Sequence, residues 1–371
     1  MMLKRFEVQN FKGFRDNLVF DLSARDYAFN KGIVKNNVVN KAIIYGKNGI
    51  GKSSLGIALF DIISHLTDKE KIPSPYLKNY RNLDADNVGI FFKYFFTFEN
   101  DEVVYEYIKL NHNNLFAETL TINQVVVVDY CYYPDIVERK YINRDVVGNL
   151  NIDLKDNKLS VIKYIYRNTP TDAIPGITKM MHFCENMLWY RCLTDGNTYA
   201  GFTNGASSLS EMLYENGKIE EFEEFLKENG LDYSLEFEEE DGKHILMAVF
   251  GGDKRVPFTA VASTGTKALY LLYAWSVSAF KNISLLFIDE FDAFFHYESA
   301  ENVVKTLNTY SDFQTILTTH NTYLMQNRLT RPDCCYLMSK NKISNLYDAT
   351  DKEIREAHNL EKMYINGAFA E

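Results

Sequence analysis

The sequence has little proline, no excess of positive charge and no long apolar run, and each shortage excludes a class of protein. Only 7 prolines occur in 371 residues, which argues against long disordered tails. The net charge of −10 is unlike that of a protein whose main task is coating DNA or RNA. No stretch approaches the ~18 apolar residues of a membrane span. The N-terminus also lacks the apolar core of a signal peptide.

Cysteine is also scarce, with five residues at positions 131, 184, 192, 334 and 335. Their number is odd, and none forms a Cys-x-x-Cys pair. This usage fits reduced thiols better than a disulfide framework or a zinc site. We therefore expect a cytoplasmic protein without a membrane partner.

Negative charge is concentrated in one segment. Residues 220–241 contain eleven acidic side chains and one basic one, Lys227, so the rest of the chain is close to neutral. Such a run is most often a solvated helix face, although it could also meet a basic partner. The near-neutral remainder of the chain still allows a local basic groove, so contact with nucleic acid is kept as an alternative.

Apolar residues make up 46% of the chain, and short apolar strands alternate with helices. This alternation predicts an α/β fold with a mainly parallel sheet, an antiparallel β part and a helical insertion. We expect an N-terminal lobe over 1–130, a mostly helical insertion over 131–242 and a C-terminal lobe over 243–371. The predicted strands are 1–10, 18–20, 38–45, 91–98, 103–110, 120–129, 244–250, 283–289, 315–319 and 334–338. The predicted helices are 52–66, 159–166, 177–193, 219–229, 266–280 and 299–308.

Residues 46–53 read GKNGIGKS and match the pattern G-x-x-x-x-G-K-[ST], between a buried strand and a helix. The glycines let backbone N–H groups turn inward around a phosphate, and the helix N-terminus adds positive potential. Lys52 would reach the β- and γ-phosphates, and Ser53 would hold Mg²⁺. The alternative is a glycine-rich turn with an incidental lysine. The predicted nucleotide-binding residues here are Gly46, Asn48, Gly49, Gly51, Lys52, Ser53 and Ser54.

A second motif, LLFIDE at 285–290, is an apolar strand that ends in two carboxylates. Ligands bind at such strand ends in open α/β sheets. Asp289 would bind Mg²⁺ through water, and Glu290 would orient or deprotonate the attacking water. The alternative is a strand that merely ends in a polar turn. We expect this strand to lie next to the strand before residues 46–53.

His320 follows the predicted strand 315–319 and lies 31 residues after Asp289 (320 − 289). That spacing would place it on a neighbouring strand tip, within reach of a γ-phosphate. A lone histidine at a strand end is more often structural.

The fourth motif is ASTGTK at 262–267, just before an apolar helix. Small residues such as Ser263 and Gly265 allow close backbone approach to an anion, which the helix N-terminus favours. The alternative is a simple N-cap.

Together the four motifs resemble those of ATP-binding-cassette (ABC) ATPases, in the branch related to SMC proteins, RecF and the OLD nucleases. GKNGIGKS resembles Walker A, LLFIDE resembles Walker B, and TTH at 318–320 resembles the switch histidine. ASTGTK resembles the signature motif in its OLD-like form. NFKGF at 10–14 and EKMYINGAF at 361–369 resemble the start and the ending of that branch.

The resemblance implies a head-to-tail homodimer, or a higher even-numbered oligomer, with two ATP molecules at the interface. Ser263 and Gly265 of one subunit would cap the γ-phosphate held by Lys52 of the other. Lys12 or Arg15 would touch the nucleotide from the N-terminal turn. ATP and Mg²⁺ are the implied ligands.

The chain also departs from the family. No Q-loop glutamine stands out, and Gln124 lies in a predicted hairpin turn. No room is left for a Toprim nuclease, so we expect a separate effector such as a nuclease, as in anti-phage defence modules. The alternatives are a stand-alone RecF-like DNA-repair ATPase and a scaffold that dimerises on ATP with little turnover.

Overall fold

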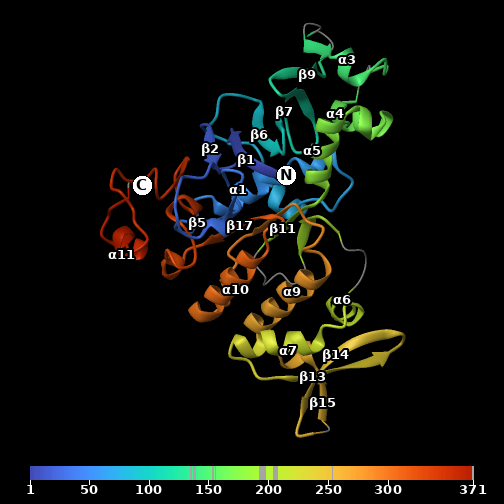
Figure 1. The fold of residues 1–371 in the computed structure, drawn as a ribbon. Helices are drawn as coiled ribbons and strands as arrows, with labels where there is room; N and C mark the ends of the chain where they lie inside the picture. The colour runs from blue at the N-terminus through green and yellow to red at the C-terminus, as the bar shows by residue number, and fades with distance from the viewer. Residues whose placement is uncertain are drawn as a thin grey trace.

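The computed structural model describes residues 1–133, 136, 139–152, 154, 156–191, 198–203, 208–252 and 254–369. Two seven-stranded sheets and one three-stranded sheet form its framework, and a two-stranded ribbon joins β3 (Val34–Lys35) to β4 (Val38–Val39). Figure 1 shows the antiparallel seven-stranded sheet and the three-stranded sheet at opposite ends, with the central sheet between them. The predicted α/β class is confirmed.

The central sheet has the strand order β12-β11-β16-β17-β5-β18-β19. Its five inner strands run parallel, and the two edge strands run antiparallel to their neighbours. Inner strands of this kind are buried on both faces, and β5, β11 and β16 have no exposed residue. The strands are β5 (Lys41–Tyr45), β11 (Met187–Tyr190), β12 (Tyr199–Gly201), β16 (Leu285–Ile288), β17 (Gln314–Thr319), β18 (Cys335–Ser339) and β19 (Lys342–Asn345).

The second seven-stranded sheet is antiparallel throughout. Along β6 and β7 the buried side chains of the inner face, most of them aromatic, alternate with more exposed polar and apolar side chains on the outer face, as in a half-buried sheet. The strands predicted at 91–98 and 103–110 are confirmed and pair as a hairpin, and a turn at Asn123 separates two strands within the predicted segment 120–129. The strands are β1 (Met2–Gln9), β2 (Leu18–Asp21), β6 (Ile90–Phe98), β7 (Asp101–Lys109), β8 (Leu115–Ile122), β9 (Val125–Cys131) and β10 (Lys140–Ile142).

Helices cover both faces of the central sheet. The sheet separates two clusters of buried residues, one on each face. One cluster holds α1, α5 and the antiparallel sheet, and the other holds α6, α7, α9 and α10. The helices are α1 (Lys52–Leu59), α2 (Ile63–Leu66), α3 (Arg144–Val147), α4 (Val161–Asn168), α5 (Pro175–Glu185), α6 (Leu209–Glu215), α7 (Ile219–Glu228), α8 (Phe258–Val261), α9 (Thr264–Ser278), α10 (Tyr297–Thr309) and α11 (Leu360–Ile365). Among the described residues, no helix combines the length and apolarity needed to cross a membrane.

The predicted helix 177–193 is wrong beyond Glu185. The chain turns at Asn186 and enters β11, which pairs in parallel with β16 in the central sheet. All four residues of β11 are apolar or aromatic and buried, so the strand shows no alternation to distinguish it from a helix. The segment 131–242 thus supplies β11 and β12 to the central sheet, and its boundaries stay a prediction.

Three smaller expectations also change. The predicted helix 52–66 is interrupted at residues 60–62 between α1 and α2, and the strand 38–45 is divided at Asn40. The predicted strand at 244–250 is β14 (Lys243–Phe250). It pairs with β13 (Ser234–Glu240) and β15 (Lys254–Pro257) in the separate three-stranded sheet. Four cysteines are buried and free, and Cys192 lies outside the described residues.

A buried lysine at the start of β5 gives the fold a pH dependence. The Lys41 ammonium donates to the carbonyl of Phe313 and the hydroxyl of Thr315, both at 2.9 Å. Burial lowers the pKa of Lys41 to about 7. Between pH 7 and pH 10 the unfolded chain therefore holds a proton that the folded chain lacks, so stability rises with pH across this window.

We expect Lys41→Met to remove this contribution. The free energy of unfolding of the wild type should gain up to about 1.4 kcal/mol per pH unit relative to the variant across that window. Denaturant unfolding at several pH values measures the difference, with the exposed Lys340→Met as a control. Parallel pH profiles for wild type and Lys41→Met would contradict the assignment.

Candidate functional site

The loop at residues 46–51 (the P-loop) joins β5 to α1 in a strained backbone path that needs glycine. Gly49 and Gly51 have φ of 77° and 115°, values that other residues rarely adopt. A Cβ on Gly51 would lie 2.9 Å from Cε1 of Phe14, and one on Gly46 would lie 3.0 Å from the carbonyl oxygen of Met338. The loop therefore has no room for side chains at these two positions.

Lys52, the first residue of α1, is buried and points back into the loop. Its ammonium donates to the carbonyl oxygens of Gly46 at 2.7 Å and of Lys47 at 3.2 Å. Burial lowers the pKa of Lys52, and the carboxylates of Asp289 and Glu290 oppose that shift. The structure thus brings Lys52 close to the end of β16. Ser53 and Ser54 follow in the first turn of α1 and are half-buried.

Asp289 and Glu290 follow β16 directly and are tied to the neighbouring strand through Thr318. The Thr318 hydroxyl donates to Oδ1 of Asp289 at 2.5 Å and accepts from the backbone N–H of Glu290 at 2.8 Å. Glu290 has a φ of 46°, which turns the chain sharply at this point. Thr318 was not among the predicted site residues, although it belongs to the TTH motif.

The second carboxylate oxygen of Asp289 has the surroundings of a cation ligand. Asp289 is 1% exposed, and its Oδ2 is buried and has no hydrogen-bond partner among the residues that the structure describes. An unpaired buried carboxylate oxygen is costly unless a cation or water completes it. A hard oxygen ligand of this kind suits Mg²⁺, so Asp289 fits the predicted metal site.

The strand order corrects one expectation. The strand of Asp289 does not lie next to the P-loop strand, because β17 lies between β16 and β5. His320 follows β17 by one residue and is exposed at the central strand tip, between the P-loop and the two carboxylates. Local sequence pattern does not encode which strands pair, so the sequence offered no signal for this order.

The signature residues lie at the N-terminus of α9. The Ser263 hydroxyl accepts from the backbone N–H of Thr266 at 3.2 Å, as an N-cap does. A Cβ on Gly265 would lie 2.6 Å from the carbonyl oxygen of Phe294, in the loop after Glu290. Among the described hydrogen bonds, none joins Ser263 to the P-loop of the same chain. Ser263 is exposed, so a second molecule could contact it.

The N-terminal turn borders the P-loop through Phe14 rather than through its basic residues. Lys12 has a φ of 47° and donates to the carbonyl of Lys78 at 2.8 Å, and burial lowers its pKa. Arg15 is exposed. Contact of Lys12 or Arg15 with a nucleotide stays a prediction. Gln124 lies in the exposed turn between β8 and β9, which rules it out as a residue of this site.

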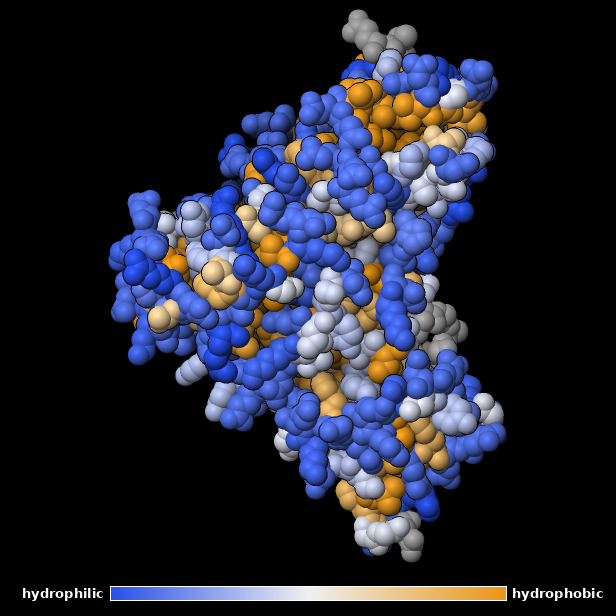
Figure 2. Space-filling view, viewed as in Figure 1, coloured by the Kyte–Doolittle hydropathy of each residue, from blue (hydrophilic) through white to orange (hydrophobic). Residues whose placement is uncertain are grey.

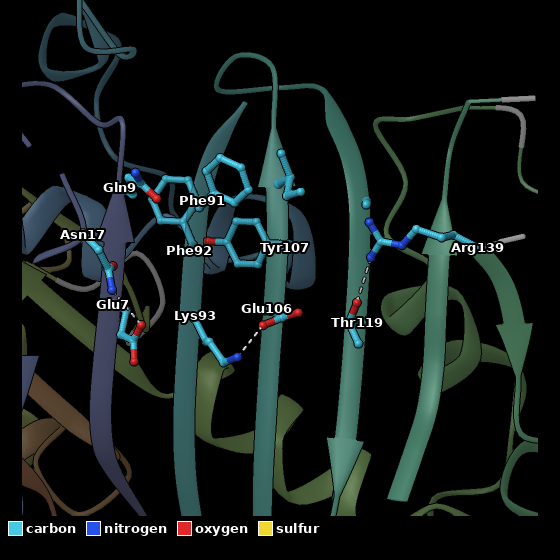
Figure 3. A pocket seen from close by; sticks show the side chains of 12 residues that line it. Glu7, Gln9, Asn17, Phe91, Phe92, Lys93, Glu106, Tyr107, Thr119 and Arg139 are labelled. Carbon is cyan, nitrogen blue, oxygen red and sulfur yellow. Dashed lines mark hydrogen bonds and ion pairs between the residues drawn. The ribbon is translucent and has the colours of Figure 1, made fainter. Parts of the chain in front are cut away.

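Two hollows help to place the ligand. One, of about 210 Å³, is lined by Lys47 of the P-loop and by Tyr364 of α11, so the C-terminal segment reaches the P-loop. The other, of about 260 Å³, crosses the outer face of the antiparallel sheet (Figure 3). Its charged side chains already pair with each other or with polar neighbours, as in Lys93–Glu106 at 2.6 Å. The P-loop therefore stays the predicted nucleotide site.

A P-loop after a parallel strand, with paired carboxylates two strands away that converge on its lysine, defines a P-loop nucleotide-binding fold. Comparison with protein families agrees with this class. Residues 196–326 match the family described as "AAA domain, putative AbiEii toxin, Type IV TA system". The matched part includes the signature, Asp289, Glu290 and His320, and it does not include the P-loop.

Solved SMC head domains are similar to the chain at 14–17% identity. An SMC head bound to the C-terminal winged-helix domain of ScpA is 17% identical, with a TM-score of 0.47 and coverage of 94% of this chain and 99% of that one. The SMC head domain of Thermotoga maritima is 15% identical, with a TM-score of 0.42 and coverage of 93% and 99%.

A third SMC head, with an extended coiled coil and bound to the C-terminal domain of ScpA, derives from Pyrococcus furiosus. It is 14% identical, with a TM-score of 0.46 and coverage of 94% and 97%. No curated protein matches the chain. Because all three TM-scores are below 0.5, the roles assigned to residues here rest on the geometry of this chain.

The conformation of the P-loop can be tested at Gly51. We expect Gly51→Ala to abolish ATP binding, because φ is 115° and the new Cβ would meet Phe14. Titration with a fluorescent ATP analogue measures the loss. Gly32→Ala is the matched control, since its Cβ would meet nothing within 4 Å. Unchanged affinity in Gly51→Ala would show that this loop does not enclose the phosphates.

Proposed function

We propose that the protein is an ABC-type ATPase that dimerises around two ATP molecules and acts as the sensor or regulator subunit of a separate effector. The observation that carries the proposal is the convergence of Lys52, Asp289 and Glu290, with Oδ2 of Asp289 buried and unpaired. These are the groups that ATP hydrolysis needs at a phosphate-binding loop.

Each residue of the site has a definable task. Lys52 binds the β- and γ-phosphates, and the N–H groups of the P-loop surround them. Ser53 and Asp289 hold Mg²⁺, which supplies charge neutralisation on the phosphate oxygens when it is bound. Glu290 orients the attacking water and accepts its proton, and the Thr318 hydroxyl fixes the Glu290 backbone for that task. His320, exposed at the central strand tip, would contact the γ-phosphate from there.

The exposed signature supports the dimer. Ser263 and Gly265 begin a 15-residue helix whose N-terminus favours an anion. Ser263 caps its own helix, and no described hydrogen bond joins it to the P-loop of the same chain, so the phosphate held by a second molecule is the anion that these two residues would bind. Each ATP would then be enclosed by the P-loop of one subunit and the signature of the other.

Two observations support the defence role and the effector. The family matched over residues 196–326 is named for a toxin of a toxin–antitoxin system. Figure 2 shows apolar atoms gathered at the upper end of an otherwise mostly hydrophilic face, over the α3–α4 segment. This segment lies in 131–242 and contains half-buried Val146 and Leu150. We propose it as the surface that binds the effector.

The dimer is tested by trapping it. Glu290→Gln should lower ATP turnover by about 10²- to 10⁴-fold, because the water loses its base while ATP still binds. Light scattering should then show an ATP- and Mg²⁺-dependent dimer, or a higher even-numbered assembly, accumulating in the variant. Glu298→Gln, at an exposed position in the first turn of α10, is the control. If ATP and Mg²⁺ change neither the mass nor the nucleotide binding of the wild type and of Glu290→Gln, the model of a dimer around two ATP molecules is wrong.

The effector is tested by isolating the protein from its own cells at endogenous expression, before and during infection. We expect a second polypeptide to co-purify in a fixed ratio. It should be lost when the half-buried apolar residues Val146 and Leu150 are changed to Asp. A protein that purifies alone under both conditions would leave a stand-alone ATPase as the better description.

A further inference from the structure

Arg191 follows β11 by one residue and lies at the same edge of the central sheet as the two carboxylates. In the parallel pair β11–β16, Tyr190 is opposite Ile288. The backbone N–H of Asp289 donates to the carbonyl oxygen of Tyr190 at 2.9 Å, which extends the pairing beyond both strands. Arg191 is therefore the neighbour of Asp289 across the sheet.

The side chain of Arg191 projects to the face of the sheet that α1 covers. Successive residues of a strand point to opposite faces, so Arg191 lies on the same side as Trp189, and Asp289 on the same side as Phe287. Trp189 and Phe287 both meet α1. A Cβ on Gly56 would lie 3.0 Å from Nε1 of Trp189 and 2.6 Å from Cε1 of Phe287. One step nearer the strand ends, Arg191 and Asp289 face the first turn of α1.

The contacts of Arg191 agree with this direction. Its guanidinium lies 4.7 Å from the ring centroid of Tyr76 and donates to the Tyr76 hydroxyl at 2.9 Å. Tyr76 belongs to the short 3-10 helix Ser74–Leu77 and packs on Trp189, with ring centroids 5.9 Å apart. Tyr76 therefore holds the guanidinium of Arg191 beside the proposed nucleotide site.

We propose that Arg191 binds the γ-phosphate of ATP and exchanges its hydrogen bond to Tyr76 for one to a phosphate oxygen. A guanidinium binds phosphate oxygens with two parallel N–H groups, and such charge-assisted bonds are stronger than a bond to a neutral hydroxyl. Arginine also stabilises the charge that develops during phosphoryl transfer. The inference rests on the proposed function.

The experiment compares affinities for a non-hydrolysable ATP analogue and for ADP, at protein concentrations below those at which ATP drives association. Arg191→Gln should weaken binding of the ATP analogue about 10- to 100-fold, the cost of one charge-assisted hydrogen bond. ADP affinity should change less than about twofold, because ADP lacks the γ-phosphate. Arg191→Lys should restore part of the loss, since it keeps the charge without the paired N–H groups.

Three controls separate the possible causes. Arg328→Gln removes a comparable exposed arginine, which pairs with Glu301 on α10, and should leave both affinities unchanged. Tyr76→Phe removes the competing hydroxyl and keeps the ring, so it should leave the affinity for the ATP analogue the same or slightly higher. Lys52→Ala tests the nucleotide site itself.

Each remaining result overturns a specific statement. If Lys52→Ala weakens binding and Arg191→Gln does not, the ATPase assignment stands and Arg191 has no part in it. If Arg191→Gln and Tyr76→Ala lower both affinities and the melting temperature together, Arg191 only anchors the Ser74–Leu77 segment. If the wild type binds no ATP analogue and Lys52→Ala changes nothing, the proposed function fails, and the role of Arg191 fails with it.

Discussion

The two hydrogen bonds of the Thr318 hydroxyl are the interactions on which the arrangement of the site depends. The hydroxyl bonds to the carboxylate of Asp289 and to the backbone of Glu290, and so fixes both residues to the central strand tip that also carries His320. Glu290 sits at a φ of 46°, a conformation that costs energy in a residue with a side chain. A partly buried hydrogen bond at 2.8 Å from its N–H to the Thr318 hydroxyl helps to offset that cost. Asp289, Glu290 and His320 are therefore all held in position by β17.

The position of the P-loop relative to this unit is set by how closely α1 approaches the sheet. Gly56 allows the approach, because any larger side chain would overlap Phe287. On its other side, α1 is held by the antiparallel sheet, where the Tyr94 hydroxyl donates to the carbonyls of Ala58 and Leu59 at 3.1 and 3.2 Å. A helix packed between two sheets cannot shift without disturbing its contacts with both. Lys52 thus begins a helix whose axis is fixed independently of any nucleotide.

Much of this could be predicted from sequence, because the P-loop, the LLFIDE strand and the antiparallel hairpin each carry a local signal. Glycines at positive φ, a buried apolar run ending in carboxylates, and strict alternation are all readable within about ten residues. The order of the strands in the central sheet, in contrast, has no such local signal. β11 pairs with a strand almost a hundred residues away, and its four apolar residues fit a helix equally well. The neighbours of Asp289 across the sheet, Thr318 and Arg191, follow from that pairing and could not be inferred without it.

The charge distribution explains how a chain of net charge −10 can still offer a site for a polyanion. Most of the acidic run 220–241 lies on α7 and β13, which Figure 1 places at the end of the molecule away from α1. Water and salt screen such exposed charges within about 10 Å. The ammonium of Lys52, in contrast, donates to carbonyl oxygens of the loop, which carry no formal charge. A triphosphate would replace these weak acceptors with charged ones, so the site is electrostatically prepared for an anion whatever the sign of the whole protein.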